Sequence, residues 1–97
     1  MILIKEDKLI TRISIIIPTL NESNNLPLLL SDLSEINNIS EILIIDSTST
    51  DKTKDIALIN GTKFYKLNKN NRGLQLNYGA EKAKGEWLLS LIHISEP

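Results

Sequence analysis

The stretch ISIIIP, residues 13–18, decides the fold of this chain. Its β-branched side chains favour an extended backbone, and its apolar run without alternation predicts a strand that is buried on both faces. A second run of the same kind, EILIID at residues 41–46, follows after a segment with helical spacing. Strands buried on both faces are typical of a parallel sheet that is covered by helices on its two sides.

The segment between these two runs predicts an amphipathic helix. Asn24 is placed to cap the first turn, and Pro27 stands where a missing N–H costs least. The apolar positions recur as one face of a helix requires. They are Leu26, Leu29, Leu30, Leu33 and Ile36.

The rest of the chain continues the alternation of helix and strand. A second helix is expected with Ser49 or Thr50 as its cap and Asp51 in its first turn, and it stops at Asn60 and Gly61. After it come a strand at 62–67 (TKFYKL), a loop at 68–73, a helix from Leu74 to Lys84 that ends at Gly85, and a strand at 86–92 (EWLLSLI). The order βαβαβαβ predicts an α/β, Rossmann-like fold, with a mostly parallel sheet and helices on both faces.

Composition narrows the classes of function. The 97 residues have a formal net charge of -1, which argues against a nucleic-acid-binding surface. The lack of cysteine excludes disulfides and cysteine-based metal sites, and it fits a reducing compartment. The longest apolar run, Ile15 to Ile17, is too short to span a membrane, and no signal peptide is recognisable. We therefore expect a cytoplasmic protein without a membrane span.

Ligands of parallel α/β sheets bind beyond the carboxyl ends of the strands. This rule singles out three loops, at residues 18–24, 46–51 and 68–73. In the first loop Thr19, Asn21 and Glu22 offer a hydroxyl, an amide and a carboxylate, which suit the edge of a base or a ribose. Alternatively, Asn21 and Ser23 bind the free N–H groups of the helix that follows.

Asp46 is the candidate in the second loop, where it is followed by a run of hydroxyl side chains. A carboxylate at the end of a buried strand is costly unless it is paired, and a ligand that donates N–H or O–H groups would satisfy it. The backbone of its own loop can do the same while Ser49, Thr50 and Asp51 cap the helix. We expect both, with acceptors of Asp46 left over for a ligand.

The third loop leads into a helix that begins near Gly73, and the N-terminus of a helix attracts anions. Arg72 carries a guanidinium whose fixed fork suits a diphosphate. Asn77 is expected to project toward the same cleft. Gly79 either allows close packing of the helix on the sheet or is an ordinary small residue of an amphipathic helix. The single histidine, His93, is not expected to bind a metal.

Taken together, three segments of the sequence resemble the family 2 glycosyltransferases of the GT-A fold. They are residues 13–33, 41–53 and 71–89, and they occur in the order and spacing of that family. The third segment most resembles a bacterial branch that carries an Arg-Gly-x-Gln-x-Asn-x-Gly-Ala motif, which here occupies residues 72–80.

The resemblance implies an enzyme that transfers a sugar from a nucleotide-diphosphate sugar to an acceptor hydroxyl, with inversion at the anomeric carbon. It assigns substrate binding to Thr19, Glu22 and Asp46 on the nucleoside side, and to Arg72, Gly73 and Asn77 near the diphosphate. Ser47 and Thr48 stand where the family often has a second acid or a glycine. The resemblance also implies a divalent cation, Mg²⁺ or Mn²⁺, in the full-length enzyme; the acceptor is left open.

The metal-binding and catalytic residues of the family follow the fourth strand, where this chain has SLIHISEP and Ser95 replaces the expected aspartate. We expect an N-terminal extension at residues 1–12, a nucleotide-sugar-binding part at 13–89, and a non-native tail at 90–97, since LSLIHISEP resembles translated adaptor sequence. On this view the chain is an incomplete donor-binding fragment without transfer activity. The alternative is a non-catalytic nucleotide-binding or structural α/β module.

Overall fold

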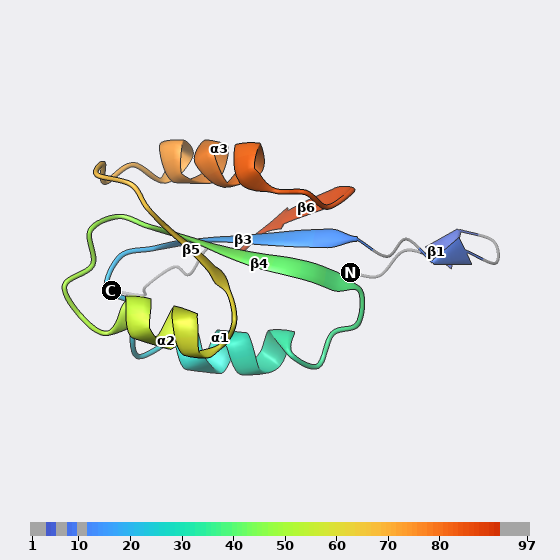
Figure 1. The fold of residues 1–97 in the computed structure, drawn as a ribbon, viewed down its shortest axis with the longest axis horizontal. Helices are drawn as coiled ribbons and strands as arrows, with labels where there is room; N and C mark the ends of the chain where they lie inside the picture. The colour runs from blue at the N-terminus through green and yellow to red at the C-terminus, as the bar shows by residue number, and fades with distance from the viewer. Residues whose placement is uncertain (1–3, 6–7, 10–11, 92–97) are drawn as a thin grey trace, which may run out of the picture.

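The computed structural model describes residues 4–5, 8–9 and 12–91, and most of them belong to one parallel sheet and its helices (Figure 1). The sheet has the strand order β5-β4-β3-β6, with β3 at Ile13–Thr19, β4 at Ile39–Asp46, β5 at Lys63–Lys66 and β6 at Trp87–Ser90. The helices are α1 at Leu26–Leu33, α2 at Thr53–Ile59 and α3 at Arg72–Lys82. A separate antiparallel pair joins β1 at Ile4–Lys5 to β2 at Lys8–Leu9.

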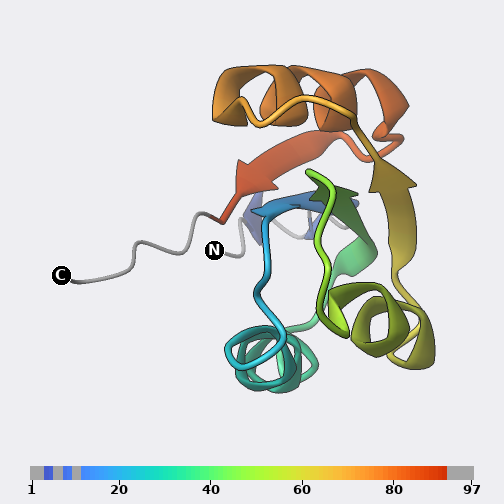
Figure 2. The ribbon, with the colours of Figure 1, turned by 90° about the vertical axis from the view of Figure 1, so that its left-hand side faces the viewer.

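The helices form two layers, one on each face of the sheet. Figure 2 shows α3 alone on one side, and α1 and α2 together on the other. All neighbouring strands of the main sheet run parallel. The predicted order βαβαβαβ and the α/β, Rossmann-like fold are therefore confirmed. β6 lies within the strand predicted at 86–92 and includes Ser90, the first residue of the expected tail at 90–97; residues 92–97 of that tail lie outside the described part of the chain.

The core explains why the run at 13–18 is apolar without alternation. Successive side chains of a strand point to opposite faces. Ile15, Ile17 and Ile44 pack toward α1 and α2, whereas Ile16 and Ile45 pack toward α3. Every residue of β3 is buried because both of its faces carry a helix layer.

The predicted cap of α1 is wrong. The helix begins at Leu26, and neither Asn24 nor the residue at the cap position, Asn25, bonds it with a side chain. The backbone carbonyl of Glu22 accepts from the N–H groups of Asn25 (3.1 Å) and Leu26 (2.8 Å) and takes over that role. Pro27 lies in the first turn as predicted, and Ile36 lies beyond the helix end.

The predicted bounds of the other two helices are also corrected. α2 begins at Thr53, so Ser49 and Thr50 are not its caps, and Asp51 precedes its first turn. α3 begins at Arg72, because the side chain of Asn71 accepts from the N–H of Leu74 (3.0 Å) and caps it. α3 ends at Lys82 rather than at Lys84.

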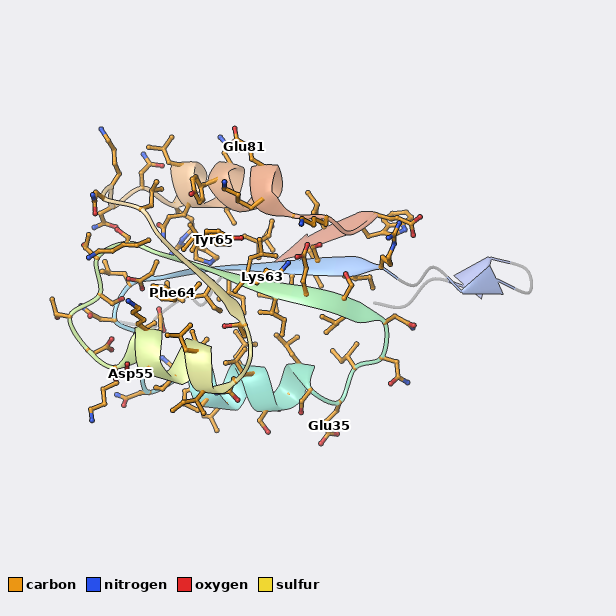
Figure 3. All side chains as sticks on the ribbon, in the orientation of Figure 1. Glu35, Asp55, Lys63, Phe64, Tyr65 and Glu81 are labelled. Atoms are coloured by element: carbon orange, nitrogen blue, oxygen red, sulfur yellow. The ribbon has the colours of Figure 1, made fainter. Side chains whose placement is uncertain are left out.

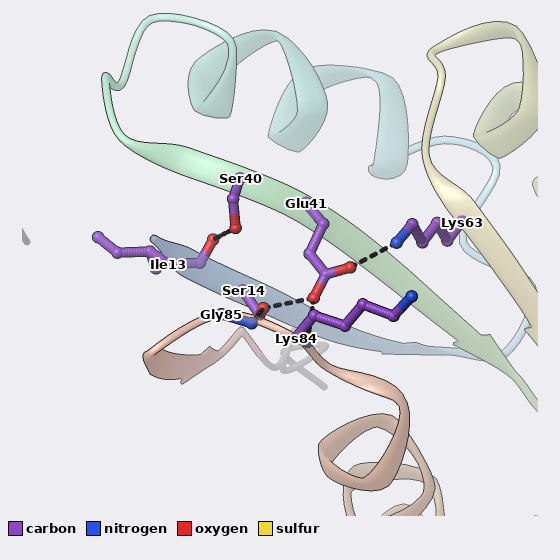
Figure 4. A network of polar contacts seen from close by, with 7 residues as sticks. All are labelled: Ile13, Ser14, Ser40, Glu41, Lys63, Lys84 and Gly85. Atoms are coloured by element: carbon purple, nitrogen blue, oxygen red, sulfur yellow. Dashed lines mark hydrogen bonds and ion pairs between the residues drawn. The ribbon is translucent and has the colours of Figure 1, made fainter. Parts of the chain in front are cut away.

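A polar network closes the amino edge of the sheet (Figure 4). The Glu41 carboxylate accepts from Lys63 Nζ (2.7 Å), from the Ser14 hydroxyl (2.6 Å) and from the backbone N–H of Lys84. The Ser14 hydroxyl in turn accepts from the N–H of Gly85 (2.8 Å). Burial raises the pKa of Glu41, but these hydrogen bonds outweigh it and lower the pKa from 4.5 to about 2. One carboxylate thus joins β3, β4, β5 and the connection from α3 to β6.

We expect this network to make stability depend on acid. Because the pKa of Glu41 is lower in the folded state than in the unfolded chain, its stabilising contribution is complete above pH 4.5 and is lost as the pH falls toward 2. Urea unfolding at a series of pH values from about 6 downward should show that the free energy of unfolding of the wild type falls in that window. In Glu41→Gln the fall should be smaller, because the variant lacks the contribution of this one carboxylate. An identical pH profile in the variant would contradict this role.

Gly79 allows α3 to lie directly on the sheet. A Cβ atom at this position would stand 2.5 Å from Ile16 Cγ2 and 3.2 Å from Ile45 Cγ1. Of the two interpretations of this glycine, close packing is confirmed.

Replacing Gly79 with alanine should destabilise the protein by about 1–3 kcal/mol, because the methyl group overpacks the interface between α3 and β3. In an exposed helix the same change would stabilise by roughly 1 kcal/mol. Asn77→Ala, on an exposed position of the same helix, is the control and should not destabilise. Chemical unfolding of both variants checks the sign, and a stabilised Gly79→Ala would show that the contact is not tight.

Candidate functional site

The centre of the candidate site is a hydrogen-bonded pair at the carboxyl edge of the sheet. Thr19 ends β3 and Asp46 ends β4, and the two residues are partners in the strand register. The Thr19 hydroxyl donates to Asp46 Oδ1 at 2.6 Å, and each residue is only 2% exposed. The structure therefore brings together two of the predicted site residues.

The loop after β4 also binds the Asp46 carboxylate. The backbone N–H of Ser49 donates to Oδ2 (2.8 Å), and the Ser49 hydroxyl donates to Oδ1. The expectation that its own loop satisfies Asp46 is confirmed. A carboxylate offers about four acceptor positions. With three of them used by Thr19 and Ser49, the carboxylate retains acceptor capacity on Oδ2.

The hydroxyl run after Asp46 ties this loop to the loop after β3. Asn21, with a φ of 53°, donates its backbone N–H to the Ser49 hydroxyl (2.7 Å), and its Oδ1 accepts from the N–H of Thr50 (2.8 Å). Asn21 therefore does not serve the N–H groups of α1, as the alternative interpretation had it. It holds the two loops together.

A second set of hydrogen bonds, at the start of α2, joins the same two loops. The N–H of Glu22 donates to the Thr53 hydroxyl (3.0 Å), and the N–H of Ser23 donates to Asp51 Oδ2 (3.0 Å). Asp51 Oδ1 accepts from the N–H of Thr53 (3.0 Å) and from its hydroxyl. The sequence interpretation assigned Asp51 to the cap of the second helix and gave Thr53 no role, because the bonds to the loop after β3 join residues that are distant in the sequence.

Glu22 and Thr48 have different places in these loops. The Glu22 carboxylate accepts from Asn25 Nδ2 (3.3 Å) and borders a mostly apolar cavity of about 210 Å³, which Thr19 also lines. Thr48 is exposed and has a φ of 54°, a backbone conformation that a β-branched residue rarely adopts. It stands at a position where the resembling family often has a glycine, which fits this conformation.

The start of α3 lies at the same edge of the sheet. Arg72 and Gly73 are its first two residues, and both are exposed. Asn77 is exposed as well, and it lies two residues, or about 200° of helix rotation, beyond the buried Gln75. The structure thus places Arg72 and Gly73 at the same edge of the sheet as Thr19 and Asp46, and it does not bring Asn77 to that edge.

Gln75 is a residue that the sequence interpretation did not include in the site. Its side chain is 4% exposed, and Nε2 donates to the backbone carbonyls of Ile45 (2.8 Å) and Thr19 (3.2 Å). The available signal was its position four residues before Gly79, which puts a polar side chain on the face of the helix that meets the sheet.

Residues 4–5, 8–9 and 12–91 contain no group of three or more His, Cys, Asp or Glu side chains that could hold a metal ion. Within the same residues, no helix has the length and apolar character needed to cross a membrane. His93 and Ser95 lie outside the described part.

These features define a class of α/β domain that offers a polar binding edge at the carboxyl ends of parallel strands. Comparison with known proteins gives the family: the model for glycosyl transferase family 2 matches residues 14–91, and the chain belongs to this family. The resemblance to family 2 is confirmed, as is its consequence that the chain is part of an enzyme family of glycosyltransferases, whereas the bacterial branch stays a prediction.

Two curated relatives and two solved structures illustrate the similarity. The chain is 38% identical over 69 residues to a 4,4'-diaponeurosporenoate glycosyltransferase of Staphylococcus haemolyticus, and 40% identical over 85 residues to an uncharacterized glycosyltransferase of Rickettsia typhi. Its fold matches S. aureus TarS 1-349 with a TM-score of 0.77 at 26% identity. It also matches glucosyl-3-phosphoglycerate synthase from Mycobacterium tuberculosis, in complex with Mn²⁺ and uridine diphosphate, with a TM-score of 0.73 at 20% identity.

The matched regions are a minor part of these proteins. They cover 71% and 84% of this chain but 18% and 26% of the two curated relatives. In the two solved structures they cover 84% of this chain and 27% and 33% of the other. The comparison therefore establishes the family and the GT-A type of fold for this part.

Asp51 should control how firmly the two loops hold together. Burial raises the pKa of Asp51, but the bonds from Thr53 and Ser23 outweigh it and lower the pKa from 3.8 to about 2. In Asp51→Asn we expect faster hydrogen exchange at the N–H groups of Ser23 and Thr53, because an amide presents a donor where the carboxylate accepted. Asp55→Asn on the exposed side of α2 (Figure 3) is the matched control.

The pH dependence of this exchange tests whether the ionised form of Asp51 stabilises the loops. The ionised Asp51 stabilises the loops above pH 3.8, and this contribution is lost as the pH falls toward 2. Equal exchange rates at Ser23 and Thr53 in the wild type and in Asp51→Asn would show that the carboxylate does not hold the loops.

Proposed function

We propose that residues 13–89 form the donor-binding part of an inverting glycosyltransferase, which transfers a sugar from a nucleotide-diphosphate sugar to an acceptor hydroxyl. The observation that carries this proposal is the Asp46 carboxylate, held by Thr19 and Ser49 at the carboxyl edge of the sheet. Family membership supports sugar transfer, and the solved structure in complex with uridine diphosphate supports a nucleotide as the ligand. A cytoplasmic location, which the lack of cysteine fits, is part of the proposal.

The residues have distinct roles in this proposal. Asp46 accepts a hydrogen bond from a base N–H or a ribose O–H, and Thr19 fixes the direction of the carboxylate. Asn21 holds the loop that carries Glu22, which lies beside the nucleoside. Arg72 and the free N–H groups at the start of α3 face the diphosphate, since a helix N-terminus and a guanidinium both favour an anion. Asn77, which points elsewhere, is the weakest member of the predicted set.

The transfer step requires groups that we do not assign to these residues. The acceptor oxygen bonds to the anomeric carbon while the bond from that carbon to the diphosphate oxygen breaks, and the diphosphate leaves with the electron pair. The acceptor proton goes to a base. A divalent cation would offset the charge of the leaving group. Because residues 4–5, 8–9 and 12–91 hold no cluster for such an ion, we propose that donor binding, and not transfer, is their part of the reaction.

Asp46→Asn should weaken the binding of uridine diphosphate by at least about tenfold, as expected for a hydrogen bond to a charged group. The change preserves the size of the side chain and removes its charge. Asp55→Asn makes the same chemical change on exposed α2 and should bind like the wild type. Isothermal titration with uridine, guanosine and thymidine diphosphates measures the affinities and shows which base is preferred.

The controls separate binding from folding. Circular dichroism and thermal unfolding must show that Asp46→Asn is folded at the titration temperature, because the change also disturbs a buried hydrogen bond. Undiminished affinity in a folded Asp46→Asn protein would overturn the assignment of Asp46. A wild type that binds none of the nucleoside diphosphates would overturn the proposed function.

A further inference from the structure

We infer that Gln75 is a positioning residue for the donor site: it holds the ends of β3 and β4 at the spacing that directs the Asp46 carboxylate. The inference rests on the proposed function and adds a residue to its site. Gln75 is buried, and in this inference it does not contact the nucleotide itself. It acts through the backbone of the two strand ends.

Gln75 contacts both strands at their carboxyl ends, next to the pair of Thr19 and Asp46. A single nitrogen atom, Nε2, donates to the carbonyl of Thr19 on β3 (3.2 Å) and to the carbonyl of Ile45 on β4 (2.8 Å). Thr19 is the residue whose hydroxyl binds Asp46, and Ile45 directly precedes Asp46. The amide group therefore bridges the two strands within one residue of the pair that forms the centre of the site.

The close approach of α3 makes this bridge possible. Gln75 and Gly79 are four residues apart, so they lie one above the other on the face of the helix that meets the sheet. The absent side chain at Gly79 lets the helix pack against Ile16 and Ile45. Gln75 also follows Arg72 by three residues on the same short helix. Its bonds thus fix the start of α3, which faces the diphosphate, relative to the strand ends that face the nucleoside.

The Thr19 carbonyl does not depend on Gln75 as its only donor. A carbonyl oxygen has two lone pairs, and the Thr19 carbonyl also accepts from the N–H of Ser47 (3.0 Å). Gln75→Met keeps roughly the length and bulk of the side chain and replaces its amide group, so that the N–H donors to both carbonyls are lost. We therefore expect this variant to fold, with the pair of Thr19 and Asp46 less firmly held.

The experiment measures the affinity for uridine diphosphate by NMR titration in the wild type, Gln75→Met and Glu81→Gln. Glu81 lies on the exposed side of α3 (Figure 3) and serves as the matched control. We expect roughly threefold to tenfold weaker binding for Gln75→Met, the equivalent of one neutral hydrogen bond, and unchanged binding for Glu81→Gln. Without nucleotide, the amide signal of Ser49 should move in Gln75→Met, because that N–H reports on Asp46 Oδ2.

A double-mutant cycle with Asp46→Asn separates positioning from a general loss of structure. If Gln75 acts through Asp46, Gln75→Met weakens binding in the wild type and has little further effect in the Asp46→Asn background. Equal weakening in both backgrounds, or wild-type affinity in Gln75→Met, would overturn the inference alone. If Asp46→Asn binds as well as the wild type, the assignment of Asp46 fails and this inference fails with it. A wild type that binds none of the nucleoside diphosphates overturns the proposed function itself.

Discussion

β3 is buried along its whole length, and this constraint organises the rest of the molecule. A strand with apolar side chains on both faces must be covered from both sides, so the chain has to supply a helix layer above and another below the sheet. α1 and α2 form one layer and α3 forms the other. The right-handed crossovers that this requires bring the loops after β3, β4 and β5 to a single edge. The candidate site is a consequence of that convergence.

The two edges of the sheet use polar side chains for different purposes. At the amino edge Glu41 is enclosed by partners from the protein itself, among them an ion pair with Lys63 and a hydroxyl of Ser14. Its carboxylate oxygens bind groups that hold the strands together. At the carboxyl edge Asp46 is also held, but by the Thr19 hydroxyl at the end of β3 and by the hydroxyl and N–H of Ser49 in its own loop. An acceptor that is fixed in direction and not enclosed by cations is suited to a ligand.

Much of the fold was predictable because it depends on local patterns. The elements and their order were predicted from the apolar runs, from the helical spacing of the leucines around Leu30, and from the helix-ending signal at Gly61. The site was predictable to the extent that Thr19 and Asp46 end neighbouring parallel strands. The rest depends on contacts between distant residues. Ser49 and Thr50 look like caps until Asn21 is seen beside them, and Gln75 looks like an ordinary helix residue until α3 is placed on the strand ends.

The central claim is that nucleotide binds at the carboxyl edge, over the pair of Thr19 and Asp46. The most direct test is an NMR map of the backbone amides that shift when uridine diphosphate is added. The account predicts shifts concentrated in the loops at 19–23 and 46–51 and at the start of α3, with the amides around Glu41 and Lys84 unchanged. Shifts confined to the amino edge, or spread without relation to these loops, would contradict it.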